Sequence, residues 1–248
     1  MVGKLGAMID LARHLTRVSQ RHILNADEIA AIRALPDEVR IFPPRSTVIR
    51  EGEVIDRSTL LLSGFMCRAK QLPNGKRHMA ELHVSGDFID LHSYTLKRLD
   101  HDIETLNSCQ LAFVPHHRLQ AMFEAFPRLA RIYWFHTSLD AANHRHWVTS
   151  IAQAPALERI ATLFCEMALR LEIVGLTREG SFDFPLTQTD LGDCLGLTPV
   201  HVNRILKTLR GRELAVFRNG RVDILDQAGL RDLAQFDPAY LYLEPEPL

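Results

Sequence analysis

The pattern of hydrophobic positions differs between the two halves of the chain. Between residues 42 and 93, short β-rich runs at 59–65, 79–84 and 87–91 alternate with glycines at positions 52, 64, 75 and 86, which are 12, 11 and 11 residues apart. Short strands between regularly spaced turn glycines predict an antiparallel, jelly-roll-like β-roll. Beyond residue 126 the apolar positions recur every three or four residues, which predicts helices. The expected fold class is therefore α+β.

A long helical stretch, residues 127–153, opens the second half of the chain. One face of it carries side chains at the alternating three- and four-residue spacing of a two-helix interface. This seam predicts a dimer contact, and the alternative is that the helix packs only on its own β-roll. Pro155 then predicts a hinge. The seam consists of Leu129, Ile132, His136, Leu139, Asn143 and His146.

Residues 185–225 predict two helices joined by a tight turn and followed by a β-hairpin. Thr187 is placed to cap the first helix together with Asp190. Thr198 followed by Pro199 predicts the start of the second helix, because a hydroxyl caps it and proline suits its first position. This order is that of a winged helix-turn-helix, which lays its second helix in the major groove of DNA.

The outer face of the second helix is basic. We predict that Arg204 reads bases, because a guanidinium fork matches O6 and N7 of guanine, a contact that contributes ~1–3 kcal/mol of discrimination. The net charge of the chain is −1, yet residues 201–221 carry six arginines and lysines against Glu213 alone, and local charge attracts DNA. Phosphate contacts are expected from Thr187, Thr198, Lys207, Arg210, Arg218 and Arg221, the last two beside the Asn-Gly hairpin turn.

The segment LTPVHVNRILKTLR, residues 197–210, resembles the recognition helix of the Crp/Fnr superfamily of bacterial transcription regulators. In this resemblance Arg204 falls on the family's guanine-reading arginine. Val200 replaces the family's glutamate and Asn203 the following small residue, so Val200, His201 and Asn203 are expected to tune the operator sequence. The β-rich first half is similar to the family's cyclic-nucleotide-binding β-roll, and the long helix corresponds to its dimer axis.

The resemblance also bears on what the β-roll binds. Gly86-Asp87 keeps the glycine-acid pair with which relatives hold a ribose, but the downstream phosphate-clamping arginine falls near 99–100, where the chain has Leu-Asp. The adenine-contacting positions fall on His144 and Arg145. A buried phosphate facing carboxylates would be repelled, so we predict no tight binding of cyclic AMP. A shifted alignment that uses Arg98 is the alternative.

No cofactor is predicted. The four cysteines are scattered, which is poor spacing for an iron–sulfur cluster, and Cys67, Cys109 and Cys194 are expected to be buried thiols. No histidine spacing indicates a zinc site, and no metal is predicted. A haem or another small effector stays open, with His92 or His101 as a candidate ligand. The cysteines are Cys67, Cys109, Cys165 and Cys194.

With 248 residues the chain suits two main units. We expect a leader at 1–20, a β-roll sensor at 21–126, a dimerisation helix and hinge at 127–154, a winged helix-turn-helix at 155–236 and a tail at 237–248. No apolar run approaches the ~20 residues that span a bilayer, so no membrane partner is expected. The cysteines are few and scattered, which fits a reducing compartment, so the expected location is the cytoplasm.

Three classes of function remain at this point. The leading hypothesis is a homodimeric transcription regulator that reads an inverted repeat in double-stranded DNA, and contacts RNA polymerase if it is an activator. The second is a regulatory module that binds a ligand and acts through protein partners, with the helix-turn-helix as a packing element only. An enzyme is not expected, because the sequence lacks a nucleophile elbow, a P-loop and a Rossmann glycine motif.

Overall fold

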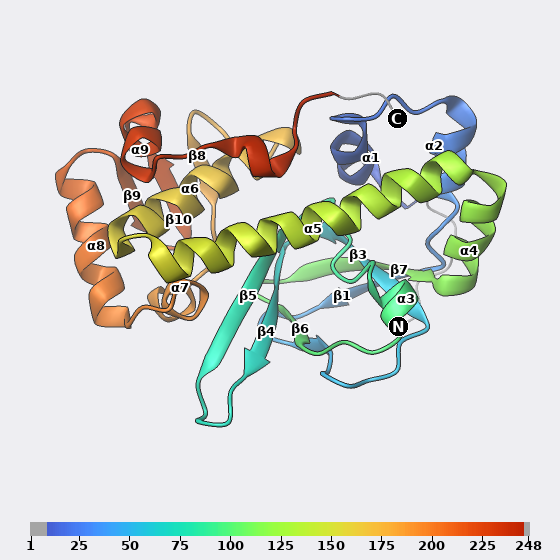
Figure 1. Cartoon of the computed structure of the whole chain (residues 1–248), viewed down its shortest axis with the longest axis horizontal. Coiled ribbons are helices and arrows are strands. Elements are labelled where there is room, and N and C mark those ends of the chain that lie inside the picture. The colour runs from blue at the N-terminus through green and yellow to red at the C-terminus, as the bar shows by residue number, and fades with distance from the viewer. Residues whose placement is uncertain (1–8, 246–248) are drawn as a thin grey trace.

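The computed structural model describes residues 9–245 (Figure 1). The parts of the expected leader at 1–8 and of the expected tail at 246–248 lie outside these residues. In chain order the elements are α1 (Ala12–Ser19), α2 (Ala26–Arg33), β1 (Glu38–Phe42), β2 (Thr47–Ile49), β3 (Arg57–Ser63), β4 (Phe65–Gln71), β5 (Arg77–Val84), α3 (Ser93–Leu96), β6 (Asp102–Thr105), β7 (Cys109–Pro115), α4 (His116–Ala125), α5 (Pro127–Gln153), α6 (Ala156–Ile173), β8 (Ser181–Asp183), α7 (Gln188–Leu195), α8 (Pro199–Gly211), β9 (Ala215–Arg218), β10 (Arg221–Ile224), α9 (Gln227–Ala234) and the 3-10 helix η1 (Pro238–Leu241).

The β-roll consists of two antiparallel sheets. One has the strand order β1-β7-β3 and the other β2-β6-β4-β5. Their facing sides are apolar, because Leu61 and Leu111 of the first sheet and Met66 and Ile103 of the second belong to one buried cluster. The predicted α+β class with an antiparallel β-roll is confirmed.

The run 87–91 was expected to be a strand, and this expectation is wrong. It makes a single bridge, between Phe88 and Leu60. Its backbone pairs with β3 only around Phe88, where Leu61 N donates to the Asp87 carbonyl and Ile89 N to the Thr59 carbonyl. The pairing goes no further because Thr59 N donates to the Asp90 side chain at 2.5 Å, and Asp87 likewise accepts from Val84 N at 3.0 Å.

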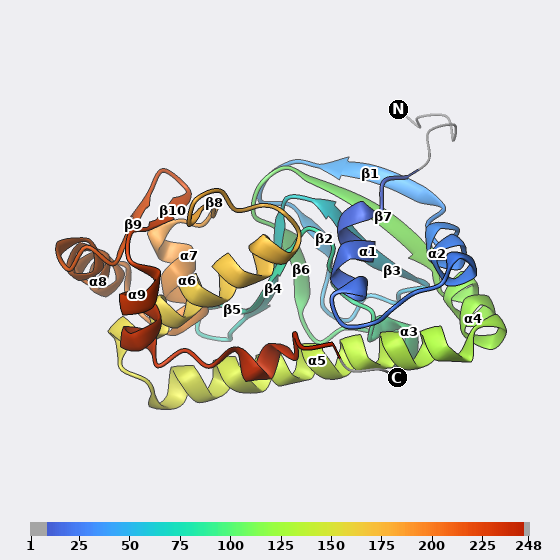
Figure 2. The ribbon, with the colours of Figure 1, turned by 90° about the horizontal axis from the view of Figure 1, so that it is seen from above.

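Helix α5 runs the length of the molecule, ~40 Å for its 27 residues, and connects the β-roll to the C-terminal unit (Figures 1 and 2). Its N-terminal half packs against α1, α2 and α4, and Leu129 and Ile132 are fully buried there. Helix α5 ends at Gln153, and Pro155 precedes α6.

The β-roll and the C-terminal unit share one apolar core. Phe65 and Met79 of the β-roll belong to the same buried cluster as Phe164 of α6 and Phe184, and the rings of Phe65 and Phe184 lie 6.2 Å apart. Helix α7 packs against β5, as Figure 1 shows. The hinge expected at Pro155 therefore lies beside a continuous packed interface, which restrains the motion of the C-terminal unit.

The expected tail begins at residue 237, and its described part, up to residue 245, is held in place. It runs beside α5 (Figure 2). The Tyr240 ring stacks on His146 with centroids 3.7 Å apart, and the Tyr240 hydroxyl donates to Glu166 Oε2 at 2.9 Å. Between residues 9 and 245, no helix is both long enough and apolar enough to cross a bilayer.

Candidate functional site

The helix-turn-helix has the local geometry that its sequence predicts. Thr187 and Asp190 form a complete capping box at the start of α7. Thr198 caps α8 by accepting a hydrogen bond from His201 N at 3.2 Å. Gly192 lets the turn between the two helices pack on α7, because a Cβ there would collide with the carbonyl oxygen of Leu197. These contacts fix the angle at which α8 leaves the domain.

Helix α8 buries one face and exposes the other. Its apolar stripe is buried against the domain, whereas Val200 is 81% exposed. The side chains of Arg204, Lys207 and Arg210 are exposed and make no hydrogen bond or ion pair with any residue that the structure describes. A helix that presents free guanidinium and ammonium groups is suited to bind phosphates and base edges.

Two of the expected DNA-contacting residues are engaged within the protein. The Thr187 hydroxyl donates to Asp190 Oδ2 at 2.7 Å, so a phosphate cannot accept its hydrogen in this arrangement, and the contact expected there is not supported. Asn203 donates to Gln188 Oε1 at 3.2 Å, which turns its amide toward α7.

The wing is the β9–β10 hairpin. Asn219 and Gly220 at its turn have φ of 53° and 69°, the positive values of a type I′ turn that the Asn-Gly pair predicts. Arg218 is exposed beside the turn, and Arg221 is exposed but paired with Asp223 at 2.9 Å. The wing therefore adds positive charge next to α8.

Helix α7 is attached to the β-roll by ion pairs. Arg45 of the loop before β2 binds both oxygens of Asp190, at 2.7 and 2.8 Å. Arg77 of β5 lies 3.4 Å from the same carboxylate. Burial alone would raise the pKa of Asp190, but its hydrogen bonds from Arg45 and Thr187 outweigh this and lower it. The position of the helix-turn-helix thus depends on side chains of the β-roll.

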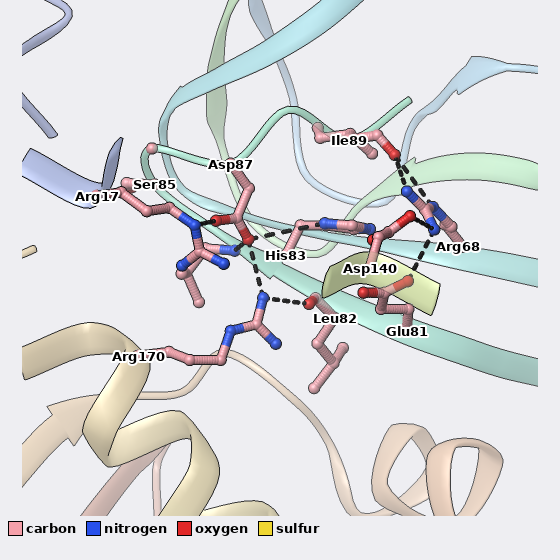
Figure 3. A network of polar contacts seen from close by, with 12 residues as sticks. Arg17, Arg68, Glu81, Leu82, His83, Ser85, Asp87, Ile89, Asp140 and Arg170 are labelled. Carbon is pink, nitrogen blue, oxygen red and sulfur yellow. Dashed lines mark hydrogen bonds and ion pairs between the residues drawn. The ribbon is translucent and has the colours of Figure 1, made fainter. Parts of the chain in front are cut away.

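A second polar site lies between the β-roll, α1, α5 and α6, and centres on Asp87 (Figure 3). Arg17 Nε of α1 lies 2.9 Å from Asp87 Oδ1, and Arg170 Nη2 of α6 lies 2.9 Å from Asp87 Oδ2. His83 Nδ1 lies 3.7 Å from Asp87 Oδ2. Burial would raise the pKa of Asp87, but the two guanidiniums outweigh it and hold that pKa far below its usual range.

A neighbouring network joins the β-roll to α5. Arg68 Nη1 of β4 lies 2.8 Å from Glu81 Oε2 and 2.7 Å from Asp140 Oδ2 (Figure 3). Desolvation raises the pKa of Glu81, whereas Arg68 outweighs the same effect at Asp140 and lowers its pKa to about 2. His92, a candidate haem ligand in the sequence, lies beside this network, with its Nδ1 3.8 Å from Asp140 Oδ2.

The site around Asp87 encloses a pocket, and the α5 residues that line this pocket are not the ones expected from the sequence. Gly86 and Asp87 line it, but His144 and Arg145 are exposed on another face of α5 and do not, so the expectation for these two residues is wrong. Arg98, the arginine of the alternative alignment, donates to the Gly52 carbonyl at 2.7 Å and is also absent from the lining. The α5 residues that line the pocket are His136, Thr137, Leu139, Asp140 and Asn143.

The seam expected to form a dimer contact is used within the protomer. Leu129, Ile132 and Asn143 are buried, so the expectation is wrong for these three. Half-buried His136 lies against His22, half-buried Leu139 lines the pocket, and His146 is covered by Tyr240. This face therefore packs within its own protomer, although not only on the β-roll as the alternative had it, because His22 and Tyr240 of η1 also lie against it.

Comparison with known proteins now identifies the fold and its DNA reader. The family described as Crp-like helix-turn-helix domain matches residues 158–233, and the cyclic nucleotide-binding domain family matches residues 39–126. The chain belongs to the Crp/Fnr family. It is a DNA-binding transcription regulator and not an enzyme.

Several relatives span most of this Crp/Fnr regulator. The transcriptional activator protein FnrA of Stutzerimonas stutzeri is 21% identical over 211 residues, 85% of this chain and 86% of the relative. The nitrogen fixation regulation protein FixK of Bradyrhizobium diazoefficiens is 26% identical over 215 residues, 85% of this chain and 87% of the relative. The structure of FixK2 from Bradyrhizobium japonicum has a TM-score of 0.72 at 22% identity, and covers 79% of this chain and 96% of that one.

The arginines that organise this Crp/Fnr regulator were not predicted from the sequence. Arg170 had a signal, because it and Glu166 interrupt the apolar face of α6 at a spacing of four, where charged residues need partners. Arg17 and Arg45 had none, since one lies in a segment without clear patterning and the other in a loop. Cys67, Cys109 and Cys194 are buried as expected, and Cys165 is buried as well; burial raises the pKa of Cys67 and Cys165 to about 12.

Proposed function

We propose that this regulator acts as a homodimer that reads an inverted-repeat operator through α8, under the control of a signal at the β-roll. The observation that carries the proposal is the exposed face of α8, where Arg204 has no partner among residues 9–245. A guanidinium that the fold leaves free is available to a guanine edge.

The other exposed side chains of α8 and the wing are assigned to base or phosphate contacts according to their position. Val200 and His201 share the exposed N-terminal turn of α8, and Val200 suits an apolar contact such as a thymine methyl group. Asn203 reaches a base only if it leaves Gln188. Phosphate contacts are proposed for the exposed residues Thr198, Lys207, Arg210, Arg218 and Arg221.

A second face of α5 supports dimerisation. Trp134, Ala141 and Val148 are exposed and spaced by seven, with Ser138 and Arg145 exposed between them. Trp134 is 73% exposed and Val148 53%, which is unusual for such side chains on a helix that otherwise buries its apolar residues. This spacing of three and four is that of a seam between two helices, and a second copy of α5 offers the same seam.

Two copies related by a two-fold axis present two α8 helices to one side of a duplex. The half-sites would then be inverted and about one helical turn apart. A signal that changes the contacts of α5 or α7 with the β-roll would change the spacing of the two readers and hence the bound population. If the protein is an activator, RNA polymerase is the further partner.

Selection from random DNA sequences by the purified protein tests whether α8 recognises bases through Arg204. Wild type should enrich a dyad-symmetric motif, and Arg204→Ala should lose one base preference in each half-site. Arg33→Ala, an exposed arginine on α2 with the same change of charge, is the matched control and should enrich the wild-type motif. Equal enrichment by wild type and Arg204→Ala would remove Arg204 as a base reader.

Sedimentation tests the dimer. Trp134→Glu places a carboxylate in the seam and should shift the protein from dimer to monomer. Ile41→Glu, which changes an equally exposed residue on β1, should leave the dimer intact. A monomeric wild type at concentrations that saturate the operator would contradict the proposal.

A further inference from the structure

The pocket around Asp87 is largely filled by side chains of the chain itself. The space that remains measures about 40 Å³, whereas pockets for small-molecule ligands usually measure ~300–1,000 Å³. Five buried polar atoms of the residues that line it have no hydrogen-bond partner among the described residues: His83 Nε2, Asp87 Oδ1, His136 Nε2, Asn143 Oδ1 and Arg170 Nε. Such a space fits one or two hydrogen-bonded water molecules.

Helix α1 packs directly on the turn that precedes Asp87. A Cβ on Gly86, whose φ is +100°, would lie 3.0 Å from the carbonyl oxygen of Arg13. His14 Nδ1 donates to the Gly86 carbonyl at 2.8 Å, so its Nε2 accepts from the Tyr133 hydroxyl at 2.9 Å. The backbone of α1 therefore touches the turn, and His14 links it to α5.

Arg17 and Arg170 bind Asp87 from opposite sides. Arg17 comes from α1 and takes Oδ1, whereas Arg170 comes from the first helix of the DNA-binding unit and takes Oδ2. Arg170 also donates to the Leu82 carbonyl at 3.0 Å and to Glu166 at 3.0 Å. One carboxylate thus joins the N-terminal helix, the β-roll and the DNA-binding unit.

We propose that α1 is the resident ligand of the β-roll pocket, and that Arg17, by completing the Asp87 site, holds α6 and the DNA-reading helices in place without a small molecule. The inference rests on the proposed function, since it concerns control of DNA binding. It differs from occupation by a nucleotide because the occupant is part of the chain and always at high effective concentration.

The mechanism follows from the geometry of the carboxylate. With Arg17 present, Asp87 is held on one side and offers Oδ2 to Arg170 in a fixed direction. Arg17 holds Oδ1 as an ion pair, since that buried oxygen accepts no hydrogen bond from the described residues. Without Arg17 the oxygen loses this charge partner, and Asp87 is free to turn away from Arg170 toward other donors. The docking of α6 on the β-roll then loosens, and this motion reaches α8 through the shared core.

The test compares the full-length wild type with Arg17→Ala and Arg13→Ala. Arg13 lies on the same helix, and its side chain makes only a 3.4 Å contact with the Leu62 carbonyl, so it is the matched control. We expect Arg17→Ala to increase hydrogen exchange in α6 and to weaken affinity for the selected operator about tenfold, within the usual range of coupling between distinct sites. Arg13→Ala should do neither.

Chemical rescue separates a resident ligand from a merely structural contact. Millimolar ethylguanidinium should restore both slow exchange in α6 and operator affinity to Arg17→Ala, because it replaces the deleted group, whereas ethylurea should not. If Arg17→Ala does not fold, Arg17→Gln keeps most of the volume and removes the charge, and the same rescue applies.

Three outcomes would overturn the inference. One is wild-type exchange and affinity in Arg17→Ala. Another is exchange in Arg17→Ala or Arg17→Gln that ethylguanidinium leaves unchanged. The third is tighter operator binding by wild type on addition of cyclic AMP or cyclic GMP, which would show that the pocket admits a nucleotide. If wild type selects no operator, the proposed function fails, but the exchange and rescue measurements still decide the role of α1.

Discussion

The Asp87 site and the outer face of α8 use arginine in opposite ways. Arg170 is 3% exposed, and its guanidinium meets Asp87, Glu166 and the Leu82 carbonyl. Arg204 is exposed, and none of the residues described bonds to its guanidinium. The same side chain thus pairs with several acceptors in the interior and is left without them on α8.

The contrast shows what each region does. A buried charge is costly to desolvate, so its partners fix one geometry and its loss is severe. An exposed charge contributes little to the fold and remains free for another molecule. Substitution should therefore affect stability at the Asp87 site and DNA binding at α8.

The largest expected effect is on stability at Asp87. Asp87→Ala leaves Arg17 and Arg170 in the interior without their carboxylate, which should lower the free energy of unfolding by ~3–5 kcal/mol. Asp223→Ala, which removes the exposed partner of Arg221, should cost less than ~1 kcal/mol. Urea unfolding measures both, and equal losses would remove the contrast.

The buried side should also depend on pH. Burial lowers the pKa of His14 to about 4, below its value of ~6.5 in an unfolded chain. As pH falls from 6.5 to 4, the unfolded state binds a proton that the folded state does not, so stability falls. His14→Gln should reduce this slope by up to ~1.4 kcal/mol per pH unit, and His117→Gln on the surface controls for loss of an imidazole. Unfolding at several pH values checks it, and an unchanged slope in His14→Gln would contradict it.

On α8 the effect should fall on specificity and leave the fold intact. Arg204→Lys keeps the charge but loses the bidentate fork, so discrimination at one base pair should fall by ~1–3 kcal/mol. Operators with a single changed base pair measure this, and urea unfolding should match wild type. A loss of stability without a loss of discrimination would reverse the assignment.

The smallest effect is expected at a phosphate contact. Lys207→Ala should weaken binding to all DNA sequences alike and lower the slope of log affinity against log salt by ~0.9 for each α8 that binds. Titrations at several salt concentrations measure the slope. A change confined to one operator sequence would indicate that Lys207 reads a base.

Local sequence rules were sufficient to predict the helix-turn-helix and the turn of its wing. The caps at Thr187 and Thr198 and the type I′ turn at Asn219 depend on residues within a few positions of one another, and all three have the predicted geometry. The same rules failed where a side chain competes with the backbone, as Asp87 and Asp90 do in the expected strand. On α5 the helical period was visible, but period alone does not say which face the fold covers, so the buried seam was taken for an interface.

The residue order alone was enough to establish the α+β class, the helix-turn-helix and its basic face, because periodicity, capping and turn chemistry act over short distances along the chain. Only the folded molecule brought Arg17 and Arg170 to one carboxylate, where Arg170 and Asp87 are separated by 83 residues. Burial decides the partners of charged groups, and burial is a property of the packed elements together, which no local pattern encodes.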